Sequence, residues 1–140
     1  MSEPVSVMIV DDHEMVRKGA KGYLEAQSDI VVVAEAASGE EAVTLVREWI
    51  PDVVLMDLVM PGMDGVEATR RVKDLSPRTQ IIVLTSYHQD EFIFPALQAG
   101  AISYLLKDVK AHDLVDAIHR AARGEATLHP RVASRVIKQF

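Results

Sequence analysis

Five polar side chains that could act on one substrate follow short apolar runs of the chain. Asp11 and Asp12 come after the first run, Asp57 ends a later one, and Thr85 and Lys107 follow the last two. Each residue alone has an ordinary explanation, because an aspartate often caps a helix and a lysine is often only solvated. If the runs are parallel strands, however, their carboxyl ends meet at one edge of a sheet, where ligands commonly bind. The five side chains then form one candidate site.

Three carboxylates at one edge of a sheet repel one another, and burial raises their pKa values unless a cation intervenes. Lys107 can offset one negative charge, and a divalent ion would offset the rest. Because a donor set made of oxygen atoms favours a hard ion, the sequence predicts Mg2+ bound by Asp11, Asp12 and Asp57. The neighbouring His13 is interpreted as the residue that starts the next helix rather than as a ligand.

The chemistry that this set of residues supports is phosphoryl transfer. A carboxylate can attack phosphorus and form an acyl phosphate. Asp57 is the best nucleophile because it stands alone at the central strand, whereas Asp11 and Asp12 are better placed as metal ligands. Lys107 would bind one phosphoryl oxygen, and Thr85 would donate a hydrogen bond to another.

The apolar runs are rich in valine and isoleucine nearly throughout, which is typical of strands covered on both faces. The predicted strands are Val5–Val10, Ile30–Ala36, Val53–Met56, Ile81–Leu84 and Ser103–Leu106. Helical periodicity fills the segments between them. The apolar stripes of the first, second and fifth helices are Met15, Val16, Ala20, Tyr23 and Leu24; Ala42, Val43, Val46 and Ile50; and Leu114, Val115, Ile118, Ala121 and Ala122. Ser38 and Glu41 have the spacing of a capping box that starts the second helix, and Gly124 suits the end of the fifth.

Five strands that alternate with five helices predict an α/β fold, a doubly wound parallel sheet with helices on both faces. Of the two common strand orders, the flavodoxin-like order 2-1-3-4-5 fits five strands. The cleft then opens at the carboxyl ends of the first and third strands, where the winding reverses. Residues 1–124 are expected to form this domain.

Residues 125–140 are expected to form a separate C-terminal segment. Proline favours the first position of a helix, so Pro130 predicts the start of a sixth helix. Its apolar stripe would consist of Val132, Ala133, Val136, Ile137 and Phe140. This helix either docks on the body of the domain or links it to a further domain that these 140 residues do not contain.

Composition excludes several classes of function. A chain of 140 residues has room for one domain of ordinary size. The absence of cysteine excludes a disulfide scaffold, a thiolate metal site and a cysteine nucleophile. No apolar run is long enough to span a bilayer and no signal-peptide pattern opens the chain, so a soluble, cytoplasmic protein without membrane contact is expected. Residues 1–122 hold 11 basic and 20 acidic side chains, so this body is not expected to bind nucleic acid by itself.

Taken in order along the chain, these motifs resemble those of the receiver domains of two-component response regulators. The resemblance runs from about Val5 to Gly124, and the gaps between the motifs agree with the family pattern. The matching segments are Val10–His13, Leu55–Gly65, Leu84–Ser86, Ala99–Ala101 and Tyr104–Lys107.

The resemblance implies that Asp57 takes a phosphoryl group from a phosphohistidine of a sensor histidine kinase. It also implies that Asp11 and Asp12 hold Mg2+ together with Asp57 and the backbone carbonyl of Val59. Such a domain catalyses its own phosphotransfer and a slow loss of phosphate, and it is not otherwise an enzyme.

The same resemblance implies a switch. Residues at the positions of Lys107 and Thr85 contact the phosphoryl group in this family. The hydroxyl then moves inward, and the aromatic residue at the position of Tyr104 rotates with it. The signal passes through the fourth helix, the fifth strand and the fifth helix. The alternative for Tyr104 is plain packing as a half-buried residue of a strand.

Four segments are most similar to the NarL/FixJ (LuxR-type) subfamily: Asp11–Arg17, Ala37–Ala42, Gly65–Thr69 and Gly124–Pro130. Full-length members carry a helix-turn-helix domain after the linker. The resemblance therefore implies DNA binding and transcription regulation only for a longer parent protein, through a domain absent from these residues. Dimerisation on phosphorylation is common in the subfamily and is expected here.

A proline departs from the expected pattern of the fourth helix. Pro95 interrupts the helical segment Asp90–Ala99, so it either kinks that helix or starts a short one at Phe94–Pro95. The short helix is favoured, and it would make the signalling face mobile.

Two apolar side chains lie near the path by which water must approach the acyl phosphate. Val59 and Tyr87 stand two residues beyond Asp57 and Thr85, and both are poor at orienting water. A slow loss of phosphate, and hence a long-lived signal, is predicted.

Three other functions compete with this interpretation. An Mg-dependent phosphohydrolase with an aspartyl-phosphate intermediate needs a second aspartate two residues after the nucleophile as its general acid, and Val59 stands there instead. A flavin or nucleotide-binding module of the same layered fold would need a glycine-rich phosphate loop, and no such pattern occurs. A stand-alone receiver that acts only by protein contact is the third, and the amphipathic tail argues mildly against it.

Overall fold

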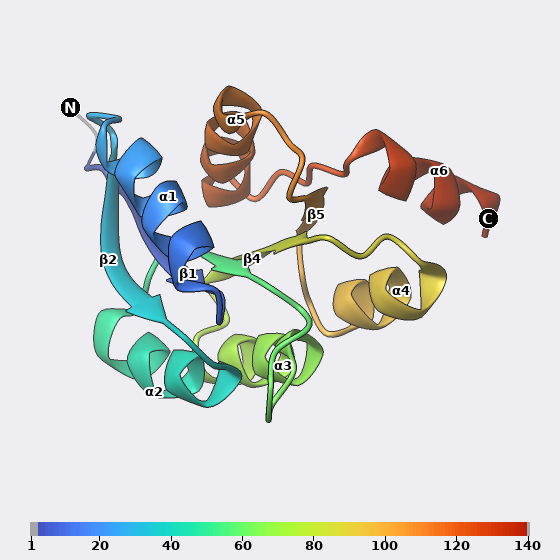
Figure 1. The fold of residues 1–140 in the computed structure, drawn as a ribbon, viewed down its shortest axis with the longest axis horizontal. Coiled ribbons are helices and arrows are strands. Elements are labelled where there is room, and N and C mark those ends of the chain that lie inside the picture. The colour runs from blue at the N-terminus through green and yellow to red at the C-terminus, as the bar shows by residue number, and fades with distance from the viewer. Residues whose placement is uncertain (1–2, 140) are drawn as a thin grey trace.

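The computed structural model describes residues 3–139, and its centre is a parallel sheet of five strands (Figure 1). The strands are β1 (Val5–Val10), β2 (Ile30–Ala36), β3 (Val53–Met56), β4 (Gln80–Thr85) and β5 (Ser103–Leu106). Their order across the sheet is β2-β1-β3-β4-β5, and every neighbouring pair is parallel. The predicted fold class and strand order are confirmed.

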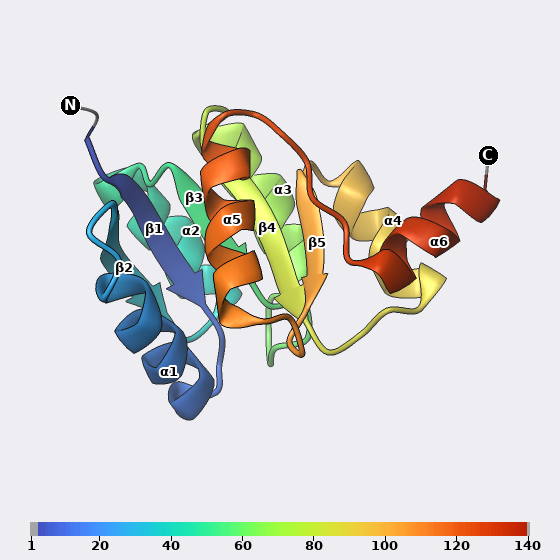
Figure 2. The same ribbon diagram turned by 90° about the horizontal axis from the view of Figure 1, so that it is seen from above.

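Helices cover both faces of this sheet. They are α1 (Glu14–Glu25), α2 (Gly39–Trp49), α3 (Gly65–Leu75), α4 (Asp90–Gln98), α5 (Ala111–Ala122) and α6 (Pro130–Lys138). Figure 2 shows α1 and α5 on one face and α2, α3 and α4 on the other. No helix of residues 3–139 is long and apolar enough to cross a membrane.

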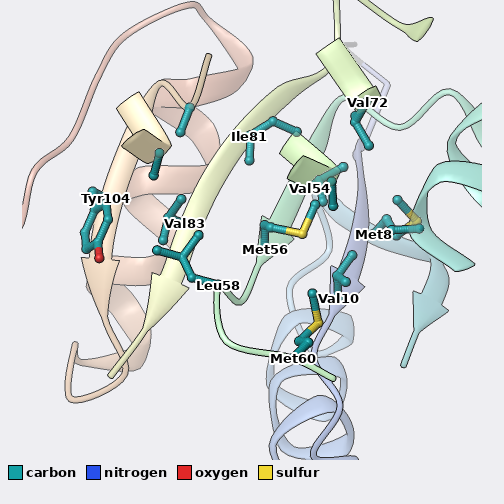
Figure 3. Close-up of a cluster of buried hydrophobic side chains, with 14 of the residues drawn as sticks. Met8, Val10, Val54, Met56, Leu58, Met60, Val72, Ile81, Val83 and Tyr104 are labelled. Atoms are coloured by element: carbon teal, nitrogen blue, oxygen red, sulfur yellow. The ribbon is translucent and has the colours of Figure 1, made fainter. Parts of the chain in front are cut away.

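Alternate residues of the strands enter two separate hydrophobic cores, because side chains of a strand point to opposite faces of the sheet. The core beneath α2, α3 and α4 is shown in Figure 3, where β1 contributes Met8 and Val10 and β3 contributes Val54 and Met56. Neighbouring positions such as Ile9 fill the core beneath α1 and α5. Burial on both faces explains why the strands are apolar throughout.

The predicted start of α2 is confirmed in detail. The Ser38 hydroxyl accepts a hydrogen bond from the Glu41 N–H at 3.1 Å, and the Glu41 carboxylate accepts one from the Ala37 N–H at 2.8 Å. The first bond satisfies a backbone donor that the first turn of a helix leaves free, and the second ties the residue before the N-cap to the same turn.

Two of the predicted apolar stripes are buried only in part. On α1, Leu24 is fully buried, but Met15 in the first turn is 85% exposed. On α2, Val46 is fully buried, but Ile50 lies just beyond the helix in a left-handed conformation (φ 41°) and is 64% exposed. Each stripe is therefore covered along one part of its helix, and the exposed ends do not belong to the core.

The short helix predicted at Phe94–Pro95 is wrong. Helix α4 runs from Asp90 to Gln98, and Pro95 lies inside it. Pro95 is the sixth of the nine residues of α4, so it removes one backbone N–H and hence one hydrogen bond from the interior of the helix. Ile93 and Ala96 are fully buried on either side of Pro95, and their packing keeps the two parts of α4 continuous.

The C-terminal segment docks on the body beside β5. Leu128 forms a parallel β-bridge with Tyr104, so the segment lies along the edge of the sheet. His129 then caps α6 and Pro130 occupies its first turn, as predicted. Val132 is fully buried within the core of Figure 3, and the Arg135 Nε lies 2.7 Å from an Asp90 carboxylate oxygen on α4. The predicted stripe member Phe140 lies outside the described residues.

Burial of Val132 predicts how α6 is held. Val132→Ala should cost about 1–3 kcal/mol of the free energy that keeps α6 docked, because two methyl groups leave a closed site. Ile137→Ala, on the same helix at a position that is 72% exposed, should change it by less than about 0.5 kcal/mol. Amide exchange of residues 130–138 measures both. Equal exchange in the two variants would show that Val132 does not hold the helix.

Candidate functional site

The carboxyl ends of three strands bring together Asp11, Asp57 and Lys107. The Lys107 Nζ lies 2.8 Å from an Asp11 carboxylate oxygen and 3.1 Å from an Asp57 carboxylate oxygen. The side chains of both aspartates are 5% exposed, and that of Lys107 is 21% exposed. One ammonium group therefore links two nearly buried carboxylates from separate strands.

Backbone hydrogen bonds continue past the strands and fix the residues of the site. The Asp57 N–H donates to the Val10 carbonyl at 3.0 Å, the Asp11 N–H donates to the Ala36 carbonyl at 3.1 Å, and the Lys107 N–H donates to the Thr85 carbonyl at 2.9 Å. The sheet itself therefore sets the spacing of these groups, as a preorganised site requires.

The turn between β3 and α3 depends on a glycine that the sequence analysis did not single out. The Gly65 N–H donates to the Leu58 carbonyl at 2.8 Å. A Cβ at Gly65 would lie 2.1 Å from the Asp57 carbonyl oxygen, which is far closer than atoms can approach. Asp64 caps α3 through its carboxylate, which accepts from the Glu67 N–H. Two signals could have indicated this close approach: the glycine directly follows a capping residue, and it lies in two of the segments that match the family pattern.

The positive charge of Lys107 only partly balances the negative charges of the carboxylates at the site. Burial raises the pKa of Asp57, the charge of Asp11 adds to this effect, and Lys107 opposes it without cancelling it. Burial alone would lower the pKa of the Lys107 ammonium, but its hydrogen bonds to Asp11 and Asp57 and their charges outweigh this, so its pKa is raised. Lys107 therefore stays charged at neutral pH.

Within residues 3–139, two buried oxygen atoms at this edge make no hydrogen bond, Asp12 Oδ1 and Thr85 Oγ1. A buried polar atom without a partner is costly, so both atoms are suited to a further ligand. Oxygen atoms of Asp11, Asp12 and Asp57 lie within 4.8 Å of one another, together with a ring nitrogen of His13. A set dominated by carboxylate oxygens fits a hard divalent cation such as Mg2+.

His13 holds the position predicted for it. It is the N-cap residue of α1, although its side chain makes no capping hydrogen bond. Its Nδ1 instead lies 3.1 Å from an Asp11 oxygen and 3.3 Å from Asp12 Oδ1. The ring is 65% exposed and so lies on the outer rim of the acidic group.

A cleft of about 470 Å³ opens over these residues. Asp57, Lys107, Val59 and Tyr87 are among the residues that line it. The side chains of Val59 and Tyr87 are largely apolar and are 41% and 39% exposed. A small anion can therefore reach Asp57 from solvent between two side chains that bind water weakly.

Tyr104 lies beside the site rather than in it. The residue is fully buried, so it is not the half-buried strand residue of the alternative interpretation. Its hydroxyl donates to the Tyr87 carbonyl at 2.6 Å. Burial and the charge of Asp57 raise the pKa of the phenol, which therefore remains a donor at neutral pH. Tyr87 follows Thr85, the last residue of β4, by two residues, so this hydrogen bond joins β5 to the loop that follows Thr85.

Residues 7–119 match the family model described as the response regulator receiver domain. Together with the parallel sheet and the acidic site, this match identifies the class of the protein. The chain belongs to the family of two-component response regulator receiver domains.

Similar proteins define its relatives within that family. The chain is 51% identical over 137 residues to the transcriptional regulatory protein LiaR of Bacillus subtilis, covering 97% of this chain and 64% of LiaR. It is 48% identical over 128 residues to the response regulator protein VraR of Staphylococcus aureus, covering 91% of this chain and 61% of VraR. The chain thus spans less than two thirds of the length of these curated relatives.

Solved structures agree with this assignment. A two-component response regulator of the LuxR family from Aurantimonas sp. SI85-9A1 superposes with a TM-score of 0.90 at 36% identity, covering 98% of both chains. The signal receiver domain of the response regulator NarL from Mycobacterium tuberculosis superposes with a TM-score of 0.84 at 34% identity, covering 89% of this chain and 100% of that one. The predicted NarL/FixJ (LuxR-type) subfamily is confirmed.

The raised pKa of Asp57 predicts the sign of its effect on stability. A carboxyl group whose pKa is higher in the folded state stabilises the fold below its unfolded pKa, and this contribution is lost as pH rises through the folded pKa. Without metal at pH 7, Asp57→Asn should therefore have a higher Tm than the wild type, with a gap that narrows toward pH 4. Asp116→Asn, an exposed position in the middle of α5, is the matched control and should show no such gap. Thermal unfolding in EDTA measures this, and a gap independent of pH would contradict it.

Proposed function

We propose that this domain accepts a phosphoryl group on Asp57 from the phosphohistidine of a sensor histidine kinase, with Mg2+ as cofactor. The observation that carries the proposal is the position of Lys107, which joins Asp57 to Asp11 beside the unpartnered oxygens of Asp12 and Thr85. This set supplies a nucleophile, a fixed cation and two free oxygen atoms at one edge of the sheet.

The residues of the chain divide the chemistry among them. One Asp57 oxygen accepts from the Leu58 N–H at 2.8 Å and the other accepts from Lys107, so the carboxylate is held in one orientation. An Asp57 oxygen attacks phosphorus, a P–O bond forms, the P–N bond to the imidazole breaks, and the imidazole leaves with the bonding electrons. Lys107 stabilises the negative charge of the phosphoryl oxygens, and the Thr85 hydroxyl donates a hydrogen bond to one of them.

The cofactor would be held by the carboxylates of Asp11, Asp12 and Asp57 and by the backbone carbonyl of Val59. When bound, Mg2+ neutralises charge on the carboxylates and on the phosphoryl oxygens. The fit rests on the oxygen-rich donor set and on Asp12 Oδ1, which makes no hydrogen bond within residues 3–139 although His13 Nδ1 lies 3.3 Å from it.

The switch would run from Thr85 to Tyr104. A Thr85 hydroxyl drawn toward a phosphoryl group moves the loop that follows β4. That loop contains the Tyr87 carbonyl, which accepts the Tyr104 hydroxyl. Because Tyr104 also bonds to the C-terminal segment through its backbone, a change at Asp57 would reach α4, β5 and α6.

The output is that of a cytoplasmic transcription regulator which dimerises on phosphorylation. Support comes from the relatives, since LiaR is a transcriptional regulatory protein and is longer than this chain. Residues 125–140 would then be the linker between the receiver domain of residues 1–124 and a DNA-binding domain beyond them. The domain acts as a regulator, and its only catalysis is its own phosphotransfer and slow dephosphorylation.

Phosphoryl acceptance predicts one labelled residue. Incubation with Mg2+ and a small phosphoryl donor should place a single phosphoryl group on Asp57, as measured by mass mapping. EDTA and Asp57→Asn should each abolish the label. Asp108→Asn, which changes an exposed aspartate next to Lys107, should retain it. A label that persists in Asp57→Asn, or a wild type that takes no label, would overturn the proposal.

Val59 and Tyr87, which line the cleft and are poor at orienting water, predict a long-lived acyl phosphate. Val59→Asn combined with Tyr87→Gln should speed the loss of phosphate roughly 10-fold or more, because polar groups can hold a water molecule near phosphorus. Tyr87→Gln keeps the backbone carbonyl that accepts the Tyr104 hydroxyl, so the switch contact remains. The rate is measured from the decay of the labelled protein. Ile137→Gln, an exposed substitution on α6, is the control, and a change of less than about twofold in the double variant would contradict the prediction.

A further inference from the structure

Arg17 contacts the acidic site through the backbone rather than through a carboxylate. Its Nη1 donates to the Asp11 carbonyl oxygen at 2.7 Å. Its Nε lies 3.3 Å from a carboxylate oxygen of Glu35 on β2. The Arg17 side chain is only 13% exposed, so both contacts are shielded from water.

The carbonyl that Arg17 holds belongs to the peptide between Asp11 and Asp12. This peptide joins the Cα atoms of Asp11 and Asp12, so its position determines where both carboxylate side chains extend from the backbone. The peptides on either side of it are also fixed: the Asp11 N–H donates to the Ala36 carbonyl, and the His13 N–H donates to an Asp11 carboxylate oxygen at 2.8 Å. The Asp11 carbonyl has left the ladder of the sheet, and Arg17 supplies its partner.

Glu35 holds Arg17 in place from the far side. Burial alone would raise the pKa of Glu35, but its hydrogen bonds to Lys18 and Lys21 outweigh this and lower it, so the carboxylate is ionised at neutral pH. The three cations on α1 that surround it are Arg17, Lys18 and Lys21, at 3.1 to 3.3 Å. Of these three, Arg17 alone has a hydrogen bond to the Asp11 carbonyl.

We propose that Arg17 is a positioning residue for the Mg2+ site: by holding the Asp11 carbonyl and Glu35 at once, it fixes the peptide that carries the Asp11 and Asp12 carboxylates. The inference rests on the proposed function, because it assigns Arg17 a role in the same site. The planar guanidinium suits this task, since its fork presents several donors in a fixed geometry.

The charge of Arg17 and its hydrogen bond to the Asp11 carbonyl should affect Mg2+ affinity in opposite directions. A nearby cation repels Mg2+, so loss of the Arg17 charge alone would strengthen Mg2+ binding or leave it unchanged. Loss of a partner that orients the ligands weakens metal binding instead, typically by about 10–100-fold. The two effects have opposite signs.

The test is direct titration of Mg2+ into the folded domain by calorimetry, for the wild type, Arg17→Gln and Lys18→Gln. Lys18→Gln is the matched control because it removes the same charge from the same helix and the same Glu35, but touches no backbone of the site. Arg17→Gln should raise the Kd for Mg2+ roughly 10-fold, whereas Lys18→Gln should leave it unchanged or lower it. The Mg2+ concentration that half-saturates labelling of Asp57 should rise by the same factor, with the rate at saturating Mg2+ little changed.

Other outcomes decide against the proposal. An Arg17→Gln protein that binds Mg2+ as tightly as the control overturns it while leaving the proposed function intact. A wild type that neither binds Mg2+ nor takes a label overturns the proposed function, and the role of Arg17 with it. Should Arg17→Gln fail to fold, Arg17→Lys carries the test. Its single ammonium cannot reproduce both contacts, so an affinity equal to that of the wild type also overturns the inference.

Discussion

The repulsion among three carboxylates at one edge of the sheet is the constraint on which the site depends. Lys107 touches two of these groups and relieves part of it, yet burial still makes Asp57 harder to ionise than a free aspartate. The sheet holds the groups together against this cost, because each follows a strand whose backbone bonds extend past its end. A site built in this way is preorganised for added positive charge and for a phosphoryl group. The repulsion among its carboxylates lowers the stability of the fold in return for this arrangement.

The fold could be predicted closely from the sequence. Four of the five strands have the predicted bounds, and β4 is longer by one residue at each end. Strands buried on both faces leave a simple signal, since nearly every residue is apolar. Helices gave a weaker signal, because an apolar residue such as Met15 can sit on the stripe and still extend beyond the core. The error at Pro95 has a similar origin, since burial of its neighbours outweighs the lost hydrogen bond and only packing reveals this.

The site was predictable where side chains act directly and was not where they act through the backbone. Carboxylates and a lysine at the ends of strands reveal themselves by type and position. Arg17 and Gly65 do not, because the first contacts a carbonyl group and the second leaves room for one. An arginine on a helix is ordinarily a solvated residue, and only the approach of α1 to the end of β1 distinguishes this one. Interactions that orient a site are therefore visible only in three dimensions.

The C-terminal segment has a consequence for the sheet as well as for α6. β5 is the last strand in the order, and the open side of such a strand is a template on which another chain can pair. Here the Tyr104 N–H donates to the Thr127 carbonyl at 3.1 Å, and the Tyr104 carbonyl accepts from the His129 N–H at 2.9 Å. Displacement of residues 127–129 would expose the Tyr104 N–H and carbonyl. The β5 strands of two molecules could then pair and form one continuous sheet. The segment that leads to α6 thus also covers the open side of β5 at Tyr104, as native proteins commonly cover the edges of their sheets.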